Sequence, residues 1–99
     1  MRRDEAIARL KAVESEIRRF GVRTLYLFGS VARDEAGAAS DLDVFVEPAA
    51  ASFYDLSNYM GAYDRLVAAF PGVAIGYSTR EGLSRHVRPT IEREAIRVF

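Results

Sequence analysis

The sequence contains no cysteine, which excludes disulfides, zinc–thiolate sites and thiol catalysis within the chain. It has no apolar run long enough to span a membrane, and residues 1–5 lead into an amphipathic segment instead of an apolar signal core. These absences indicate a cytoplasmic protein that does not contact membranes. His86 is the only histidine, and its neighbours Arg85 and Val87 indicate a surface residue in preference to a metal ligand.

Neither sign of charge is in excess, since 14 basic residues balance 14 acidic ones. This balance argues against direct binding of nucleic acid, which usually requires a basic surface. It also leaves little repulsion between copies, so a homo-oligomer is compatible with the composition. Lys11 is the single lysine, and the remaining basic residues are arginines. Arginine suits bidentate contacts to phosphate, although codon bias explains the same preference.

The chain is also short. Its 99 residues, 49% of them hydrophobic, predict a single domain (residues 1–99) with a modest core. Apolar residues at three- to four-residue spacing predict two long helices, over 4–20 and 52–70. Asp4 and Ser52 are the residues expected to cap their starts.

Short β-prone runs predict strands over 24–28, 41–47 and 73–78. Three further elements are expected: a short helix, a partly helical segment interrupted near Pro89, and a short final strand (30–33, 80–95 and 96–99). The order of elements indicates an α/β or α+β fold with a small mixed β-sheet flanked by helices.

The pair Gly29-Ser30 ends the apolar run of residues 25–28. A strand that leads into a helix start presents unpaired backbone N–H groups, and the helix dipole adds partial positive charge there. Glycine permits close approach of a ligand, and the serine hydroxyl adds a donor. Phosphate oxygens need such donors, although the same pair is equally typical of an ordinary turn with a serine cap.

Ten residues later, Asp41 and Asp43 stand two apart on the predicted second strand, so both side chains are expected on one face. Two adjacent carboxylates repel one another unless a cation lies between them. Mg²⁺ is commonly held by one or two carboxylates together with substrate phosphates. If the two strands are neighbours, phosphate donors and metal ligands meet at one end of the sheet. Taken alone, the pair also fits a polar strand entrance.

The run Leu-Phe-Gly-Ser-Val-Ala-Arg (27–33), followed by Ser-Asp-Leu-Asp-Val (40–44), resembles the polymerase-β-type nucleotidyltransferase superfamily. Chain length and motif placement resemble its minimal, stand-alone members. The resemblance covers nearly the whole chain, because the flanking helices and residues 79–83 also fit. It implies a polymerase-β-like nucleotidyltransferase fold.

The resemblance also implies roles for the motif residues. Gly29 and Ser30 would bind a nucleoside triphosphate, and Asp41 and Asp43 would bind Mg²⁺ and serve catalysis. Arg33 matches an arginine that often follows the Gly-Ser pair and contacts phosphate, whereas its position fits a solvated helix residue equally well.

Minimal members are often encoded beside a small helical protein of the HEPN type and act as the antitoxin of that pair. Some of them transfer AMP from ATP onto a tyrosine of the toxin. The resemblance therefore implies ATP as substrate, Mg²⁺ as cofactor and a HEPN-type toxin as partner.

The pattern departs from active members at a third acidic position on a later strand. Aligned on residues 73–78, that position is Gly76, which has no ligand atom. Glu47 and Glu81 are the conceivable substitutes, but the first lies about 13 Å beyond Asp43 along the strand and the second would need a loop to fold back. The sequence thus leaves three readings open: an active transferase, a catalytically degenerate antitoxin that acts by binding its toxin, and a nucleotide-sensing module.

Two further features carry alternatives. Tyr59 and Tyr63 share a helix face, which predicts core packing, or else an interface with a helical partner. The C-terminal fifth is rich in arginine with glutamates between (Glu81, Glu92 and Glu94), which predicts a solvated face in preference to a phosphate or partner site.

Overall fold

The computed structural model describes all 99 residues, and its centre is a four-stranded mixed sheet in the order β3-β2-β1-β4. The strands span Val22–Phe28 (β1), Leu42–Pro48 (β2), Ile75–Thr79 (β3) and Ile96–Arg97 (β4). β1 pairs antiparallel with both β2 and β4, while β2 pairs parallel with β3. The expected small mixed sheet flanked by helices is confirmed.

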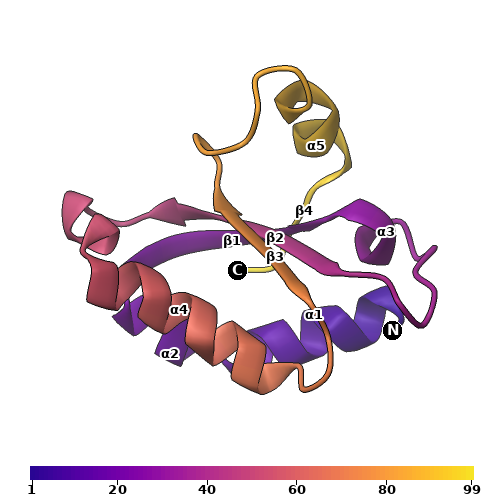
Figure 1. Ribbon diagram of the computed structural model, residues 1–99, viewed down its shortest axis with the longest axis horizontal. Coiled ribbons are helices and arrows are strands. Elements are labelled where there is room, and N and C mark those ends of the chain that lie inside the picture. Colours follow the sequence, from indigo (N-terminus) through magenta and orange to yellow (C-terminus); the bar gives the residue numbers. More distant parts are fainter.

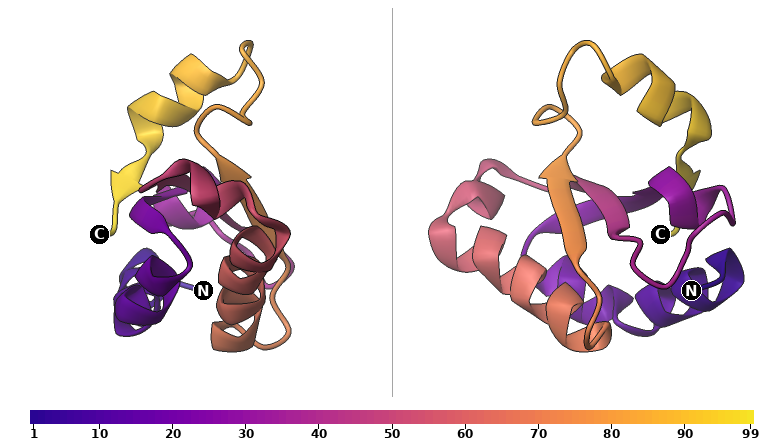
Figure 2. Two further views of the ribbon diagram at one scale, coloured as in Figure 1. Left: turned by 90° about the vertical axis from the view of Figure 1, so that its left-hand side faces the viewer. Right: turned by 45° about the vertical axis from the view of Figure 1, so that its right-hand side comes forward.

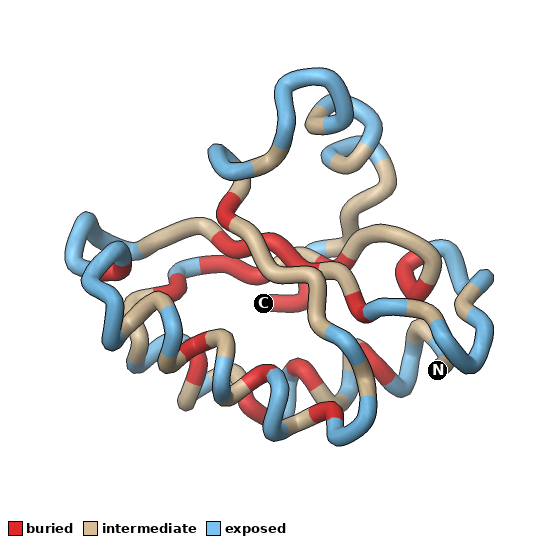
Figure 3. Tube along the Cα trace, in the orientation of Figure 1, coloured by how far each residue is buried: buried red, intermediate tan, exposed pale blue.

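Three helices cover one face of this sheet: α1 (Arg3–Ala12), α2 (Glu14–Arg19) and α4 (Leu56–Ala69) (Figures 1 and 2). Their apolar residues pack against every second residue of β1 and β2, the ones whose side chains point toward the helices. The result is one core cluster, built around fully buried residues from both layers (Leu10, Ile17, Leu25, Leu27, Val44, Val46, Leu66 and Phe70). Figure 3 shows this burial along the strands and the inner sides of the helices.

The opposite face of the sheet is covered differently. Tyr26 and Phe45 stack there with ring centroids 4.7 Å apart, and the Arg80 guanidinium lies over both rings. Above them passes an arch (residues 81–95) that carries α5 (Arg88–Glu94) (Figures 1 and 2). No residue of the arch is buried, so hydrophobic packing contributes little to holding it in place.

The predicted helix over 4–20 is wrong in one detail, because Val13 interrupts it. Val13 has φ −108° and ψ 10°, and its side chain is buried in the core. A β-branched residue is stiff, and this one takes non-helical dihedrals while it packs inward. Asp4 is not the cap: Arg2 occupies that position and no side chain caps the helix, so Asp4 lies in the first turn.

The predicted cap at Ser52 is also wrong. Residues Ala51–Tyr54 form a separate 3-10 turn (η1) that buries Phe53 completely. Asp55 has a non-helical ψ of 136°, so the chain changes direction there and α4 begins only at Leu56. The need to bury Phe53 therefore divides what the spacing predicted as one helix.

Near the C-terminus, Pro89 lies in the first turn of a helix where an interruption was expected. It is the second residue of α5, where its missing N–H has no partner to lose. After β4, Val98 and Phe99 stay buried and exchange backbone hydrogen bonds with Leu25. No helix has the length and apolar content needed to cross a bilayer.

Candidate functional site

The structure brings the separate motif positions together at one end of the sheet. Asp43 is paired in register with Phe28 of β1 on one side and with Gly76 of β3 on the other. Gly29 follows Phe28 directly, so the Asp43 side chain lies between two glycines. A Cβ added to either glycine would overlap a carboxylate oxygen, Oδ2 from Gly29 and Oδ1 from Gly76. Both glycines therefore let the backbone approach the Asp43 carboxylate closely in its present rotamer.

Gly29 also makes the turn out of β1. Its φ of +78° is costly for any residue with a Cβ, and it leads directly into α3 (Gly29–Ala32). Because α3 is a single turn, a helix dipole adds little here, and the phosphate donors on offer are individual backbone N–H groups and the partly exposed Ser30 hydroxyl. Asp34 ends the segment with φ 59°, and its Oδ1 accepts a hydrogen bond from the Arg3 N–H at 3.0 Å.

Asp41 lies just outside β2, which begins at Leu42 and not at residue 41 as predicted. It is exposed, whereas Asp43 is half-buried. Burial raises the pKa of Asp43, and the negative charge of Asp41 raises it further. The positive charge of Arg33 opposes this rise in pKa, and the negative charge of Glu94 adds to it. The site therefore carries unbalanced negative charge that a bound cation would relieve.

The carboxylates at this end of the sheet fit Mg²⁺ only together with ligands from outside the protein. Asp41 and Asp43 supply two carboxylates, and Gly76 adds no ligand beside them. Nowhere do three or more histidine or acidic side chains gather in a metal-binding arrangement. Two carboxylates fit Mg²⁺ that is bound together with triphosphate oxygens and water, which is a common arrangement for this ion. They do not fit a cage built by the protein alone.

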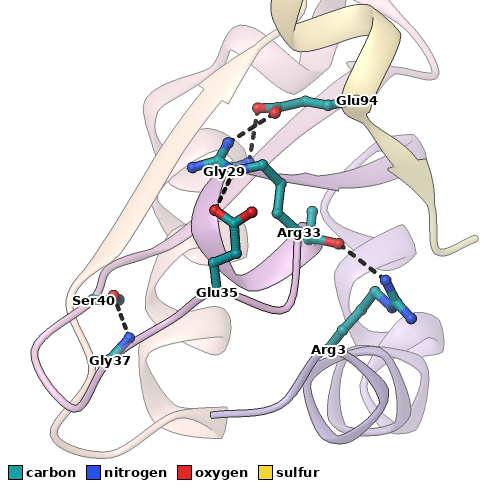
Figure 4. A network of polar contacts seen from close by, with 8 residues as sticks. Arg3, Gly29, Arg33, Glu35, Gly37, Ser40 and Glu94 are labelled. Atoms are coloured by element: carbon teal, nitrogen blue, oxygen red, sulfur yellow. Dashed lines mark hydrogen bonds and ion pairs between the residues drawn. The ribbon is translucent and has the colours of Figure 1, made fainter.

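Arg33 is exposed, and its guanidinium reaches Glu94 beside the Gly29 turn (Figure 4). Its Nη1 lies 2.8 Å from Glu94 Oε2, and its Nε lies 3.3 Å from Glu35 Oε2. The hydrogen bond to Glu94 is the main reason that the pKa of Arg33 is raised. The other Glu94 oxygen, Oε1, accepts a hydrogen bond from the Gly29 N–H at 3.2 Å.

Glu94 is the site residue that sequence reasoning missed. Its neighbours in the chain predict a solvated charged face, and 65 residues separate it from Gly29. Only the placement of α5 over the end of β1 brings the carboxylate to the Gly-Ser turn. No local signal in the sequence distinguishes it from Glu92, which pairs with Arg80.

The two substitutes considered for the third carboxylate lie elsewhere. Glu47 accepts a hydrogen bond from the Thr24 hydroxyl at 2.6 Å and pairs with Arg80 at 3.2 Å. The Thr24 bond is the largest cause of the lowered pKa of Glu47. Glu47 and Glu81 both line a recess of about 320 Å³ at the far end of β2 from Asp43. Neither therefore replaces the ligand that Gly76 lacks.

A Gly-Ser turn at the end of one strand, beside paired aspartates at the start of the next, defines the polymerase-β-like nucleotidyltransferase class. Residues 10–98 match the family model described as the nucleotidyltransferase domain. The chain belongs to this family, among its minimal members.

Two similar proteins agree with this assignment. The chain is 32% identical over 94 residues to a protein named protein adenylyltransferase MntA from Thermococcus cleftensis, covering 90% of this chain and 88% of that one. A solved structure described as a candidate minimal nucleotidyltransferase superposes with a TM-score of 0.79 at 33% identity. That match covers 97% of this chain and 95% of the other.

Proposed function

We propose that residues 1–99 act as one domain that transfers AMP from ATP to a hydroxyl of a partner protein. The observation that carries the proposal is the position of Asp43, which lies in register between the Gly29 turn and β3 with Asp41 two residues away. This arrangement supports a site in which the Gly29 turn binds phosphate and the two aspartates bind a metal at the same end of the sheet. The similar protein named as a protein adenylyltransferase supports ATP as the nucleotide and a protein as the acceptor.

Each residue has a role in this proposal. The backbone N–H groups of the Gly29 turn and the Ser30 hydroxyl donate to phosphate oxygens, and Arg33 adds a bidentate cation. Asp41 and Asp43 would hold Mg²⁺, which supplies charge neutralisation for the departing pyrophosphate. The acceptor oxygen forms a bond to the α-phosphorus while the bond to pyrophosphate breaks, and the hydroxyl proton leaves to solvent.

The partner in this proposal is a small helical toxin of the HEPN type, and the acceptor is a tyrosine of that toxin. The recess at the far end of β2 lies away from Asp43. The proposal therefore has the partner bring its own hydroxyl to Asp41 and Asp43. The protein would then act as a cytoplasmic antitoxin that silences its toxin by modification.

A second candidate function is neutralisation by binding alone. Gly76 stands directly beside Asp43 in the parallel pair and provides no carboxylate. Active members of the superfamily place an acidic residue at the position that aligns with it. Without that residue the acceptor hydroxyl has one fewer group to assist its deprotonation, so turnover would be slow or absent while the complex still forms.

Label transfer from α-³²P-ATP separates the two functions. The purified protein is incubated with its HEPN-type partner, ATP and Mg²⁺, and label on the partner is measured for the wild type and for Asp41→Asn and Asp43→Asn. We expect label from the wild type and a decrease of at least ~100-fold in both variants, because a misplaced or missing metal ligand typically costs this much. Asp64→Asn, on the exposed side of α4, is the matched control and should transfer normally.

Absence of label, together with neutralisation that survives Asp41→Asn, would contradict the enzymatic function and favour the binding one. Gly76→Asp then tests the third position. The new side chain must displace the Asp43 oxygen that now lies over residue 76, which a terminal carboxylate can do by rotating. Faster transfer in Gly76→Asp would assign residue 76 as the missing position, and an unchanged rate with Mg²⁺ still bound would count against it.

A further inference from the structure

Glu94 occupies the donors that a triphosphate would need. Its Oε1 accepts from the Gly29 N–H at 3.2 Å, and its Oε2 lies 2.8 Å from Arg33 Nη1 (Figure 4). These are a backbone donor at the glycine turn and the guanidinium beside it. A carboxylate that bridges them presents two anionic oxygens, as a phosphate group would.

The negative charge of Glu94 would also repel a nucleotide, whose phosphates carry negative charge. The Glu94 carboxylate makes the potential at Asp43 more negative, in the same direction as the Asp41 carboxylate. A triphosphate that arrives at this end of the sheet meets a third carboxylate in the space its own oxygens would take. The anion and Glu94 therefore compete for the same donors.

The arch that carries Glu94 is held lightly enough to move. None of its residues is fully buried, although Leu83 and Ile91 are half-buried. Its side chains make polar contacts to the rest of the molecule only from α5, where Glu92 pairs with Arg80 and Glu94 contacts Arg33 and the Gly29 N–H. Partly exposed ion pairs contribute little stability. A segment with no buried apolar side chains opens at low cost.

We propose that Glu94 is a latch on the phosphate end of the site, and that a nucleotide binds by displacing this carboxylate and lifting α5 from the Gly29 turn. The proposal rests on the proposed nucleotide site and adds a step to it. The ligand-free protein holds its own substitute for the triphosphate, and binding exchanges that substitute for the nucleotide.

Calorimetric titration with ATP and Mg²⁺ tests the latch. Glu94→Gln removes the charge and keeps the size, so it should bind ATP about two- to fivefold more tightly than the wild type, the range expected when a partly exposed ion pair no longer competes. Glu35→Gln is the matched control: it removes the other acidic partner of Arg33 and leaves the Gly29 N–H covered. Its affinity should change less than twofold.

The outcomes separate the latch from the site. Equal or weaker binding by Glu94→Gln, or an equal gain in Glu35→Gln, overturns the latch while the nucleotide site stands. No binding by either the wild type or Glu94→Gln overturns the site and the latch together.

Amide hydrogen exchange gives an independent readout. A displaced latch predicts faster exchange over residues 88–95 when ATP and Mg²⁺ are added. Slower exchange there would show that Glu94 positions Arg33 for the nucleotide, and would contradict the latch.

Discussion

At the scale of single residues, Gly29 is required for both the turn and the close approach of Asp43. Gly29→Ala should lower the free energy of unfolding by about 1–2 kcal/mol, because a Cβ is strained at φ +78° and meets Asp43 Oδ2. The same change should also remove ATP binding, since Asp43 must move away. Denaturant unfolding and calorimetry measure the two effects.

Gly37→Ala is the control for that substitution. A Cβ at Gly37 has no neighbour within 4 Å, and its φ is not positive. Its stability should stay within about 0.5 kcal/mol of the wild type. A Gly29→Ala protein as stable as Gly37→Ala, with ATP binding intact, would contradict the role given to the turn.

The proposed metal ligand Asp43 opposes folding stability in its ionised form. Because burial and the Asp41 charge raise its pKa in the folded protein, the ionised carboxylate is less favourable folded than unfolded. This destabilisation is fully present above the folded pKa and disappears as pH falls below the unfolded value of about 4. Asp43→Asn should therefore raise the thermal midpoint at pH 7, and the gain should vanish near pH 3.

The control for this second substitution is Asp64→Asn, which changes an exposed carboxylate on α4 and should leave the midpoint unchanged. A lower midpoint for Asp43→Asn at pH 7 would mean that the Asp43 charge stabilises the fold.

At the scale of elements, α4 packs unusually close to the end of α2. A Cβ at Gly61 would overlap the Phe20 ring. Gly61→Ala should therefore destabilise the protein by about 1 kcal/mol, since overpacking costs about 1–3 kcal/mol and the better helix propensity of alanine returns only about 1 kcal/mol. Urea unfolding measures this change.

Asp64→Ala separates these two contributions, because residue 64 lies on the same helix but is exposed. Its stability should rise slightly from propensity alone. If Gly61→Ala is stabilised as much as Asp64→Ala, the close contact with Phe20 is not rigid.

The elements also show what the sequence could predict. The apolar runs located β1 and β2, but that the two strands are neighbours was only assumed from the sequence and is shown by their pairing in the sheet. The broken helix at Val13 and the separate η1 turn were not predictable from periodicity, because burial of Val13 and Phe53 overrides the local helical pattern. The position of Glu94 beside the Gly29 turn was not predicted for a different reason. It depends on α5 crossing the sheet, which no local sequence pattern encodes.

At the scale of the whole molecule, the sheet is asymmetric. One face is packed by α1, α2 and α4, and the other carries the site beneath the lightly held arch (Figure 2). The packed layer fixes Asp43 between its two glycines, and under the proposed latch the movement that admits a nucleotide falls on the arch.

The most direct test of the central claim is binding of ATP with and without Mg²⁺. The combination of phosphate donors at Gly29 and carboxylates at Asp41 and Asp43 predicts saturable binding that strengthens with Mg²⁺, and that loses the Mg²⁺ dependence in Asp43→Asn. Binding that is absent from both the wild type and Glu94→Gln, or that ignores both Mg²⁺ and Asp43→Asn, would contradict a metal–triphosphate site at this end of the sheet.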